Sequence, residues 1–185
     1  MSRPSPITEL PPVSREGVEP TQAPELRWIG THSPVSCLWP VGGLSEELTA
    51  LNSRHLQEFT DAVAFATRQV LILDPHFDGQ LGLPSMWDAL EVASDRDVPI
   101  WIITNRLREL REWLRVTGRH LPATIEIKAA STPLRFHDRF ALVDGDLWHF
   151  GSTVGGGYPA LSAATHGWGG HVQDFERLFR AWWEP

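Results

Sequence analysis

The chain has 185 residues, enough for one globular domain with a hydrophobic core. Hydrophobic residues make up 42% of it and charged residues 21%, a balance typical of folded domains and not of disordered chains. The formal net charge of −7 argues against the broad basic surface of a non-specific DNA-binding protein, although it is compatible with a local basic patch.

Two absences bear on where the protein acts. No stretch approaches the roughly 20 apolar residues of a membrane-spanning helix, and the first residues lack the apolar core of a signal peptide. Cys37 is the only cysteine, which excludes an intramolecular disulfide and a cysteine metal cluster and suits a reducing compartment. We therefore expect a cytoplasmic protein without membrane insertion.

Residues 1–25 are predicted to form a disordered tail. Prolines recur there among serine, threonine and glutamate, and such a stretch buries too little apolar surface to offset the entropy lost on ordering. Residues 26–185 are predicted to form a single domain. Its first segment, residues 26–43, is apolar but interrupted by prolines and glycines, which indicates one or two short strands at the edge of the domain.

Helices and strands alternate from Ser45 onward. The continuous apolar runs at residues 69–74 and 98–104 predict buried strands. A helix is expected to open at Pro84 between these runs, and Asn105 is expected to cap another helix after the second run. An amphipathic helix before the first run is predicted by apolar residues at three- and four-residue spacing: Leu48, Leu51, His55, Phe59, Ala62, Val63 and Ala66.

The second half of the chain predicts strands first and a helix last. Residues 123–129 alternate like a half-buried strand, and the runs at 139–144 and 147–152 are joined by a tight-turn signal at Asp144-Gly145-Asp146. The nine tryptophans are expected mainly in the core and at interfaces. This order predicts an α/β layered domain in which helices flank a mixed β-sheet. The closing helix is indicated by Val172, Phe175, Phe179, Trp182 and Trp183.

The candidate site lies in the stretch "RFHDRFALVDGDLWHFGST". Side chains alternate along a strand, so His137 and Arg139 are expected to point the same way. An imidazole can attack phosphorus or transfer protons, and a guanidinium binds two phosphate oxygens at once. Asp144 can orient a histidine, while Gly151 and Ser152 would place a backbone N–H and a hydroxyl near the same phosphate.

The spacing of these residues, H-x-[K/R]-x4-D-x6-G-S, resembles the signature of the phospholipase D superfamily, H-x-K-x4-D-x6-G-S-x-N. The upstream "LILDPHFD" is similar to the strand and turn that open many small domains of the superfamily, and the resemblance covers roughly residues 45–183. It implies a phospholipase D-like domain in which His137 is the nucleophile of a covalent phosphohistidine intermediate. It also implies that Arg139 binds phosphate, Asp144 is structural and Ser152 supports the site. No metal or other cofactor is expected.

In the superfamily two such motifs meet face to face, and the second histidine protonates the leaving group. Because this chain carries one motif, the resemblance implies a homodimer that places two copies of His137 across a two-fold axis. Small members with a single motif are often nucleases. The expected activity is therefore that of a metal-independent phosphodiesterase acting on nucleic acid.

Two departures from the signature leave other interpretations open. Arg139 replaces the lysine, with the same charge but a different shape, in a chain whose only lysine is Lys128. Val154 replaces the asparagine and removes a polar group from the phosphate site. One alternative is a catalytically degenerate module that binds phosphorylated ligands or a partner protein. Another is an unrelated α/β interaction domain in which the match is fortuitous.

Three further features are candidates for a functional role. His76 follows a predicted strand end, where ligand-facing loops often begin, and is expected either to contact substrate or to be structural. The glycine-rich residues 154–170 are predicted to form a mobile loop beside the site, with Tyr158, His166 and Trp168 as ligand contacts. A row of arginines forms either a solvated helix face or a basic rim that steers nucleic acid: Arg106, Arg108, Arg111, Arg115 and Arg119.

Overall fold

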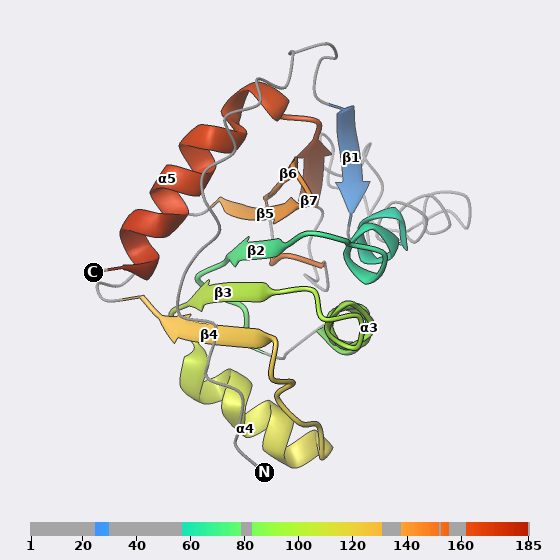
Figure 1. The fold of residues 1–185 in the computed structure, drawn as a ribbon, viewed down its shortest axis with the longest axis vertical. Coiled ribbons are helices and arrows are strands. Elements are labelled where there is room, and N and C mark those ends of the chain that lie inside the picture. The colour runs from blue at the N-terminus through green and yellow to red at the C-terminus, as the bar shows by residue number, and fades with distance from the viewer. Residues whose placement is uncertain are drawn as a thin grey trace, which may run out of the picture.

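The structure, a computed structural model, describes residues 25–29, 57–78, 83–130, 138–151, 153–155 and 162–184. Their strands form one seven-stranded sheet in the order β1-β7-β6-β5-β2-β3-β4 (Figure 1). β2, β3 and β4 run parallel, and all other neighbouring pairs are antiparallel, so the predicted mixed sheet is confirmed. The strands are β1 (Glu25–Ile29), β2 (Val70–Leu73), β3 (Ile100–Thr104), β4 (Ile125–Ala129), β5 (Arg139–Val143), β6 (Asp146–Phe150) and β7 (Ser162–His166).

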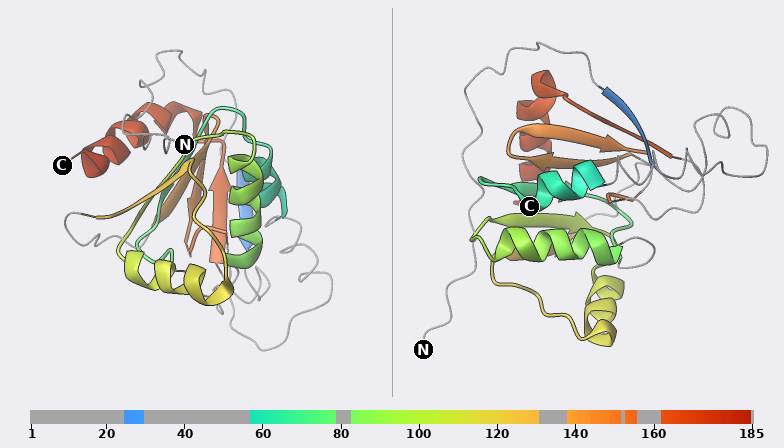
Figure 2. Two further views of the ribbon diagram at one scale, coloured as in Figure 1. Left: turned by 60° about the horizontal axis from the view of Figure 1, so that its bottom comes forward. Right: turned by 90° about the vertical axis from the view of Figure 1, so that its right-hand side faces the viewer.

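Helices cover both faces of this sheet, as Figure 2 shows. α3 (Leu83–Ser94) and the helical residues 57–64 pack on one face, and α5 (Val172–Trp183) covers the other. α4 (Leu107–Thr117) follows β3 and joins the core on the α3 side through its two buried leucines, Leu110 and Leu114. The expected α/β layering is therefore present.

β2 lies near the middle of the sheet, and its side chains alternate between the two cores. Val70 and Ile72 join the cluster beneath α3, while Leu71 and Leu73 join the cluster beneath α5. β3 and β5 flank the strand and helices cover both faces, so all four residues are buried. This double burial explains why the run is continuously apolar instead of alternating.

The β5–β6 hairpin closes through a two-residue turn. Val143 pairs with Asp146, which leaves Asp144 and Gly145 as the turn residues. Both have positive φ, 53° for Asp144 and 106° for Gly145, as a type I′ turn requires. Aspartate tolerates this region better than most residues and glycine has no side chain to clash, so the predicted tight turn is confirmed with its physical reason.

The start of α4 differs from the prediction. The residue at the N-cap position is Arg106, not Asn105, and it makes no side-chain capping bond. The hydroxyl of Thr104, the last residue of β3, instead accepts a hydrogen bond of 3.0 Å from the Arg106 N–H. Asn105 donates its own N–H to the Pro75 carbonyl, so it ties the start of the helix to the loop after β2.

The glycine-rich stretch also differs, because residues 162–166 form β7 and pair with both β1 and β6. β1 occupies the sheet edge, as expected for the 26–43 segment, although it begins at Glu25. The predicted tail spans residues 1–25; its last residue, Glu25, lies in β1, and residues 1–24 lie outside the described residues. The first turns of the predicted helix at 45–56 and Tyr158 also lie outside them. No helix within the described ranges is long and apolar enough to cross a membrane.

Candidate active site

Four strands bring their ends together at one edge of the sheet. β2 and β3 are parallel and end there, β5 is antiparallel to β2 and begins there, and β6 ends there. The register pairs Leu73 with Phe140 and Arg139 with Phe150. Asp74, one residue past β2, therefore meets Arg139 at the start of the motif strand, and Gly151 follows β6 beside it.

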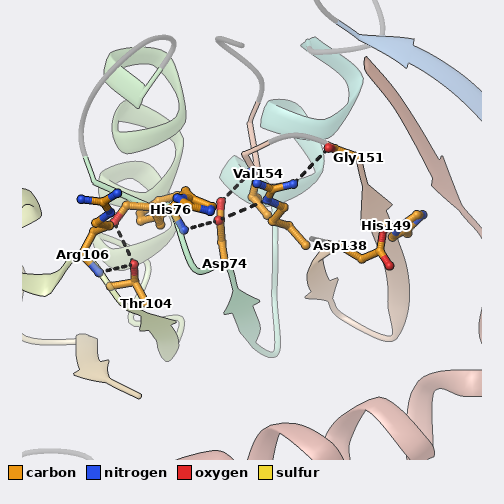
Figure 3. A network of polar contacts seen from close by, with 10 residues as sticks. Asp74, His76, Thr104, Arg106, Asp138, His149, Gly151 and Val154 are labelled. Carbon is orange, nitrogen blue, oxygen red and sulfur yellow. Dashed lines mark hydrogen bonds and ion pairs between the residues drawn. The ribbon is translucent and has the colours of Figure 1, made fainter. Parts of the chain in front are cut away.

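Asp74 is fully buried, and both of its carboxylate oxygens accept hydrogen bonds (Figure 3). The His76 N–H donates to Oδ1 at 2.7 Å, and the Val154 N–H donates to Oδ2 at 2.8 Å. The Nε of Arg139 lies 3.8 Å from Oδ1. Burial raises the pKa of Asp74 to about 6, against the lowering effect of the two backbone hydrogen bonds and of the guanidinium.

Arg139 is the cation beside Asp74 at this edge. Its side chain is 12% exposed, and one terminal nitrogen donates to the Gly151 carbonyl at 3.0 Å. The guanidinium is thus fixed between the end of β2 and the end of β6. A guanidinium held in this way is suited to binding phosphate oxygens, because little side-chain entropy remains to be lost.

Val154 contributes through its main chain. Its side chain is 1% exposed and packs in the core under α3, while its N–H reaches Asp74. The next residue, Gly155, has a φ of +84°, and a Cβ there would lie 2.9 Å from side-chain atoms of Met86 in α3. The turn after β6 is therefore seated against α3 by close backbone approach.

The structure describes four of the six predicted site residues. His137 and Ser152 lie outside the described residues, so their predicted roles are not tested. Arg139 and Gly151 are in contact at the edge. His76 lies beside them in the loop after β2, with an exposed side chain and its N–H on Asp74.

Asp144, grouped by the motif with the catalytic residues and predicted either to orient a histidine or to be structural, lies at the opposite end of β5 from Arg139. Its carboxylate accepts hydrogen bonds from the Thr67 N–H and hydroxyl and from the N–H groups of Arg68 and Gln69. Partial burial raises its pKa, but these bonds outweigh that effect and the pKa is lowered. The contacts fasten the hairpin to the segment entering β2, as expected of a structural aspartate, and none of them supports a direct role in chemistry.

The other predicted ligand contacts are engaged within the fold. The His166 ring lies 2.9 Å from an Asp146 carboxylate oxygen and stacks on Trp148, and the Trp168 indole N–H donates to Thr165. His149 lies 3.1 Å from Asp138 beside the start of β5. Among the described residues, no group of three or more histidine, cysteine, aspartate or glutamate side chains is arranged to hold a metal ion.

The arginine row of α4 is largely paired with acids. Glu109 lies within 3.7 Å of Arg106 and 3.5 Å of Arg108, and Arg115 forms a two-pronged pair with Glu112. Further along, Arg119 contacts Asp88 and Glu91 of α3. These pairs favour the solvated-face interpretation over a basic rim.

Sequence reasoning missed Asp74. The available signal was a carboxylate that directly follows a fully apolar run and precedes a proline. A residue at the end of a strand that is buried on both faces is itself expected to be buried. A buried acid needs a partner, and that requirement points to a cation elsewhere in the chain. Which cation it is depends on the antiparallel pairing of β2 with β5, which the local pattern does not specify.

Comparison with known proteins supports the fold. No protein-family model matches the chain, and no curated protein matches it in sequence. NucT from Helicobacter pylori, a phospholipase D-family nuclease, superposes with a TM-score of 0.57 at 8% identity, over 86% of this chain and 97% of NucT. The phospholipase D-like fold expected from the sequence is therefore confirmed.

Two other solved structures match over a smaller part of their length. TrmBL2, an archaeal chromatin protein, gives a TM-score of 0.46 at 16% identity over 69% of this chain and 47% of its own. Polyphosphate kinase from Porphyromonas gingivalis gives 0.48 at 17% identity over 68% of this chain and 21% of its own. Both scores are too low to bear on the site.

Proposed function

We propose that the chain is a metal-independent phosphodiesterase of the phospholipase D type that acts on nucleic acid as a homodimer. The observation that carries the proposal is the position of Arg139. Its guanidinium is held at the sheet edge where the motif strand begins, two residues from His137 in the sequence. The fold shared with NucT supports the same conclusion.

The proposed reaction has two steps. An imidazole nitrogen of His137 attacks phosphorus, a nitrogen–phosphorus bond forms, and the bond from phosphorus to the leaving oxygen breaks. The partner subunit's His137 donates a proton to that oxygen. Water, giving up a proton to the same partner histidine, then attacks the phosphohistidine and releases a phosphomonoester. Arg139 offsets the charge on the phosphoryl oxygens throughout.

The test is cleavage of single-stranded and duplex oligonucleotides in the presence of EDTA. Wild type should cleave, and His137→Ala should reduce the rate by about a thousandfold or more, since removing a covalent nucleophile typically costs that much. The matched control is His120→Ala, at an exposed position after α4, which should leave the rate unchanged. A rate that persists in His137→Ala, or vanishes with EDTA, would contradict the proposal.

The dimer has its own test. A monomer in solution at concentrations where cleavage is measured would contradict the two-histidine mechanism. Mixing inactive His137→Ala with wild type should lower the specific activity below that expected from dilution, because each mixed dimer lacks one of its two histidines.

One observation favours a second candidate, a module that binds phosphorylated ligands without turnover. Val154 occupies the family's asparagine position, and its side chain is buried in the core, so it offers no polar group to a phosphate. In that case wild type would bind a 5′-phosphorylated oligonucleotide, lose the affinity on Arg139→Ala, and cleave nothing. The shared fold argues against a fortuitous motif match. A cytoplasmic location stays a prediction.

A further inference from the structure

We propose that Asp74 is a positioning residue for Arg139, and that the pair takes the place of the lysine and asparagine of the superfamily signature. The inference rests on the proposed function only in assigning phosphate to this edge. The buried carboxylate holds the guanidinium and the turn after β6 in one arrangement. Neither the resemblance nor the comparisons assign Asp74 a role.

The contacts of Asp74 reach three separate parts of the chain. The bond from the His76 N–H is local and merely shapes the loop after β2. The bond from the Val154 N–H and the approach of Arg139 are different, because they join β2 to the far side of the hairpin. A fully buried carboxylate is costly unless it is paired, so the fold retains this one at the point where three segments converge.

The shape of arginine suits this arrangement. The Nε side of the guanidinium faces Asp74 while a terminal nitrogen donates to the Gly151 carbonyl. A planar guanidinium can donate to one partner while it lies at ion-pair distance, 3.8 Å, from another, whereas the ammonium of lysine is a point charge on a flexible stem. The substitution at position 139 is therefore matched by an acid at position 74.

The second departure from the signature is matched as well. The asparagine of the signature is replaced by Val154, whose side chain turns into the core and whose main-chain N–H meets Asp74. The turn is thus held by a backbone hydrogen bond to a buried acid. Asp74 accounts for both departures at once.

The arrangement makes anion binding depend on pH. Burial raises the pKa of Asp74 to about 6, and the charged groups that act on it are Arg139 on β5 and Asp78 in the same loop. The exposed His76 side chain is a further titratable group of that loop. Ionised Asp74 attracts the guanidinium, and protonation as the pH falls through about 6 removes that attraction.

The experiment measures sulfate binding by calorimetry in the His137→Ala background between pH 5 and pH 8. Sulfate keeps its charge over this range, and the background removes the titration of the nucleophile. Asp74→Asn should weaken binding about tenfold at pH 7.5 and abolish the inflection near pH 6. Arg139→Lys should weaken binding similarly, and the double variant should be no weaker than either single variant.

The matched control is Asp78→Asn, which removes a carboxylate from the same loop. Loss of a nearby negative charge should by itself strengthen anion binding, so this control is expected to bind sulfate as well as or better than its parent. The opposite sign in Asp74→Asn separates positioning from simple electrostatics. Equal or tighter binding by Asp74→Asn would overturn the inference.

Two outcomes keep the inference distinct from the proposed function. Sulfate binding that follows this pattern without nucleic-acid cleavage by wild type would contradict the nuclease alone. Cleavage together with sulfate affinity indifferent to Asp74 would contradict the positioning role alone. Circular dichroism monitors folding. If Asp74→Asn fails to fold, Arg139→Lys decides, and unchanged sulfate affinity in that variant overturns the inference.

Discussion

Asp74 and Asp144 lie at opposite ends of the neighbouring strands β2 and β5, and their surroundings shift their pKa values in opposite directions. Asp144 is half-buried at the closed end of the hairpin, accepts four hydrogen bonds and has a lowered pKa. Asp74 is fully buried at the open end, accepts two, lies beside a guanidinium and has a raised pKa. The difference shows that the balance of burial and donors, and not residue type, separates an anchor from a titrating group.

The largest expected effect concerns the closed end. Asp144→Ala should lower the free energy of unfolding by about 4 kcal/mol, at roughly 1 kcal/mol for each lost hydrogen bond. Denaturant titration measures it. Sulfate affinity of the folded variant should stay unchanged, because the contacts at Arg139 are untouched. A stable variant with weakened sulfate binding would reverse the assignment of the two aspartates.

The pH dependence of stability should have opposite signs at the two positions. Because the pKa of Asp74 is raised in the folded protein, its protonation contributes to the free energy of unfolding. This contribution is full below the ordinary pKa of 3.8 and is lost as the pH rises to about 6. That loss corresponds to about 3 kcal/mol. The lowered pKa of Asp144 means that its contribution is present above 3.8 and is lost on acidification.

These signs are checked by subtracting the free energy of unfolding of wild type from that of each variant at the same pH. Unfolding free energies are measured from pH 3 to pH 7 for wild type, Asp74→Asn and Asp144→Asn. Relative to wild type, the free energy of unfolding of Asp74→Asn should increase as the pH rises from about 4 to about 6. That of Asp144→Asn should increase relative to wild type as the pH falls. Parallel curves for the two variants would show that both acids sit in equivalent environments.

The smallest of the three effects concerns the turn that seats Val154. Gly155→Ala should cost about 2 kcal/mol, from the positive φ and the close approach to Met86, and should weaken sulfate binding by displacing the turn. Gly118→Ala is the matched control, because Gly118 has a φ of +69° but no atom within 4 Å of an added Cβ. Equal costs at both glycines would show that the contact with Met86 contributes nothing.

The sequence predicted most of the elements that depend on local pattern. The buried run ending at Leu73, the Asp144-Gly145 turn and the helix closing at Trp183 all carry their signals within a few residues. The signal for β7 was weaker, since its small residues lie in a glycine-rich stretch and its pairing with β1 joins distant segments. The local periodicity of a sequence does not show which distant strands pair with each other.

The contacts of the site also differ in whether they are local or join distant parts of the sequence. Arg139 and Gly151 belong to one hairpin, so fixed spacing was enough to bring them together. Asp74 and Val154 are 80 residues apart, and their contact depends on how β2 aligns with that hairpin. The bond from the Arg106 N–H to the Thr104 hydroxyl, by contrast, is local, because the two residues are only two positions apart in the sequence.

The two-residue turn has a consequence for the signature itself. β5 runs out from Arg139 to Val143, the chain reverses over Asp144 and Gly145, and β6 returns until Phe150 stands opposite Arg139. Gly151 is the first residue past that pair. The spacing from Arg139 to Asp144 is thus set by the length of β5, and the spacing from Asp144 to Gly151 by the turn and the length of β6. A one-residue insertion in β5 would carry the guanidinium to the α5 side of the sheet, and one in β6 would instead turn Phe150 out of the cluster on the α3 side.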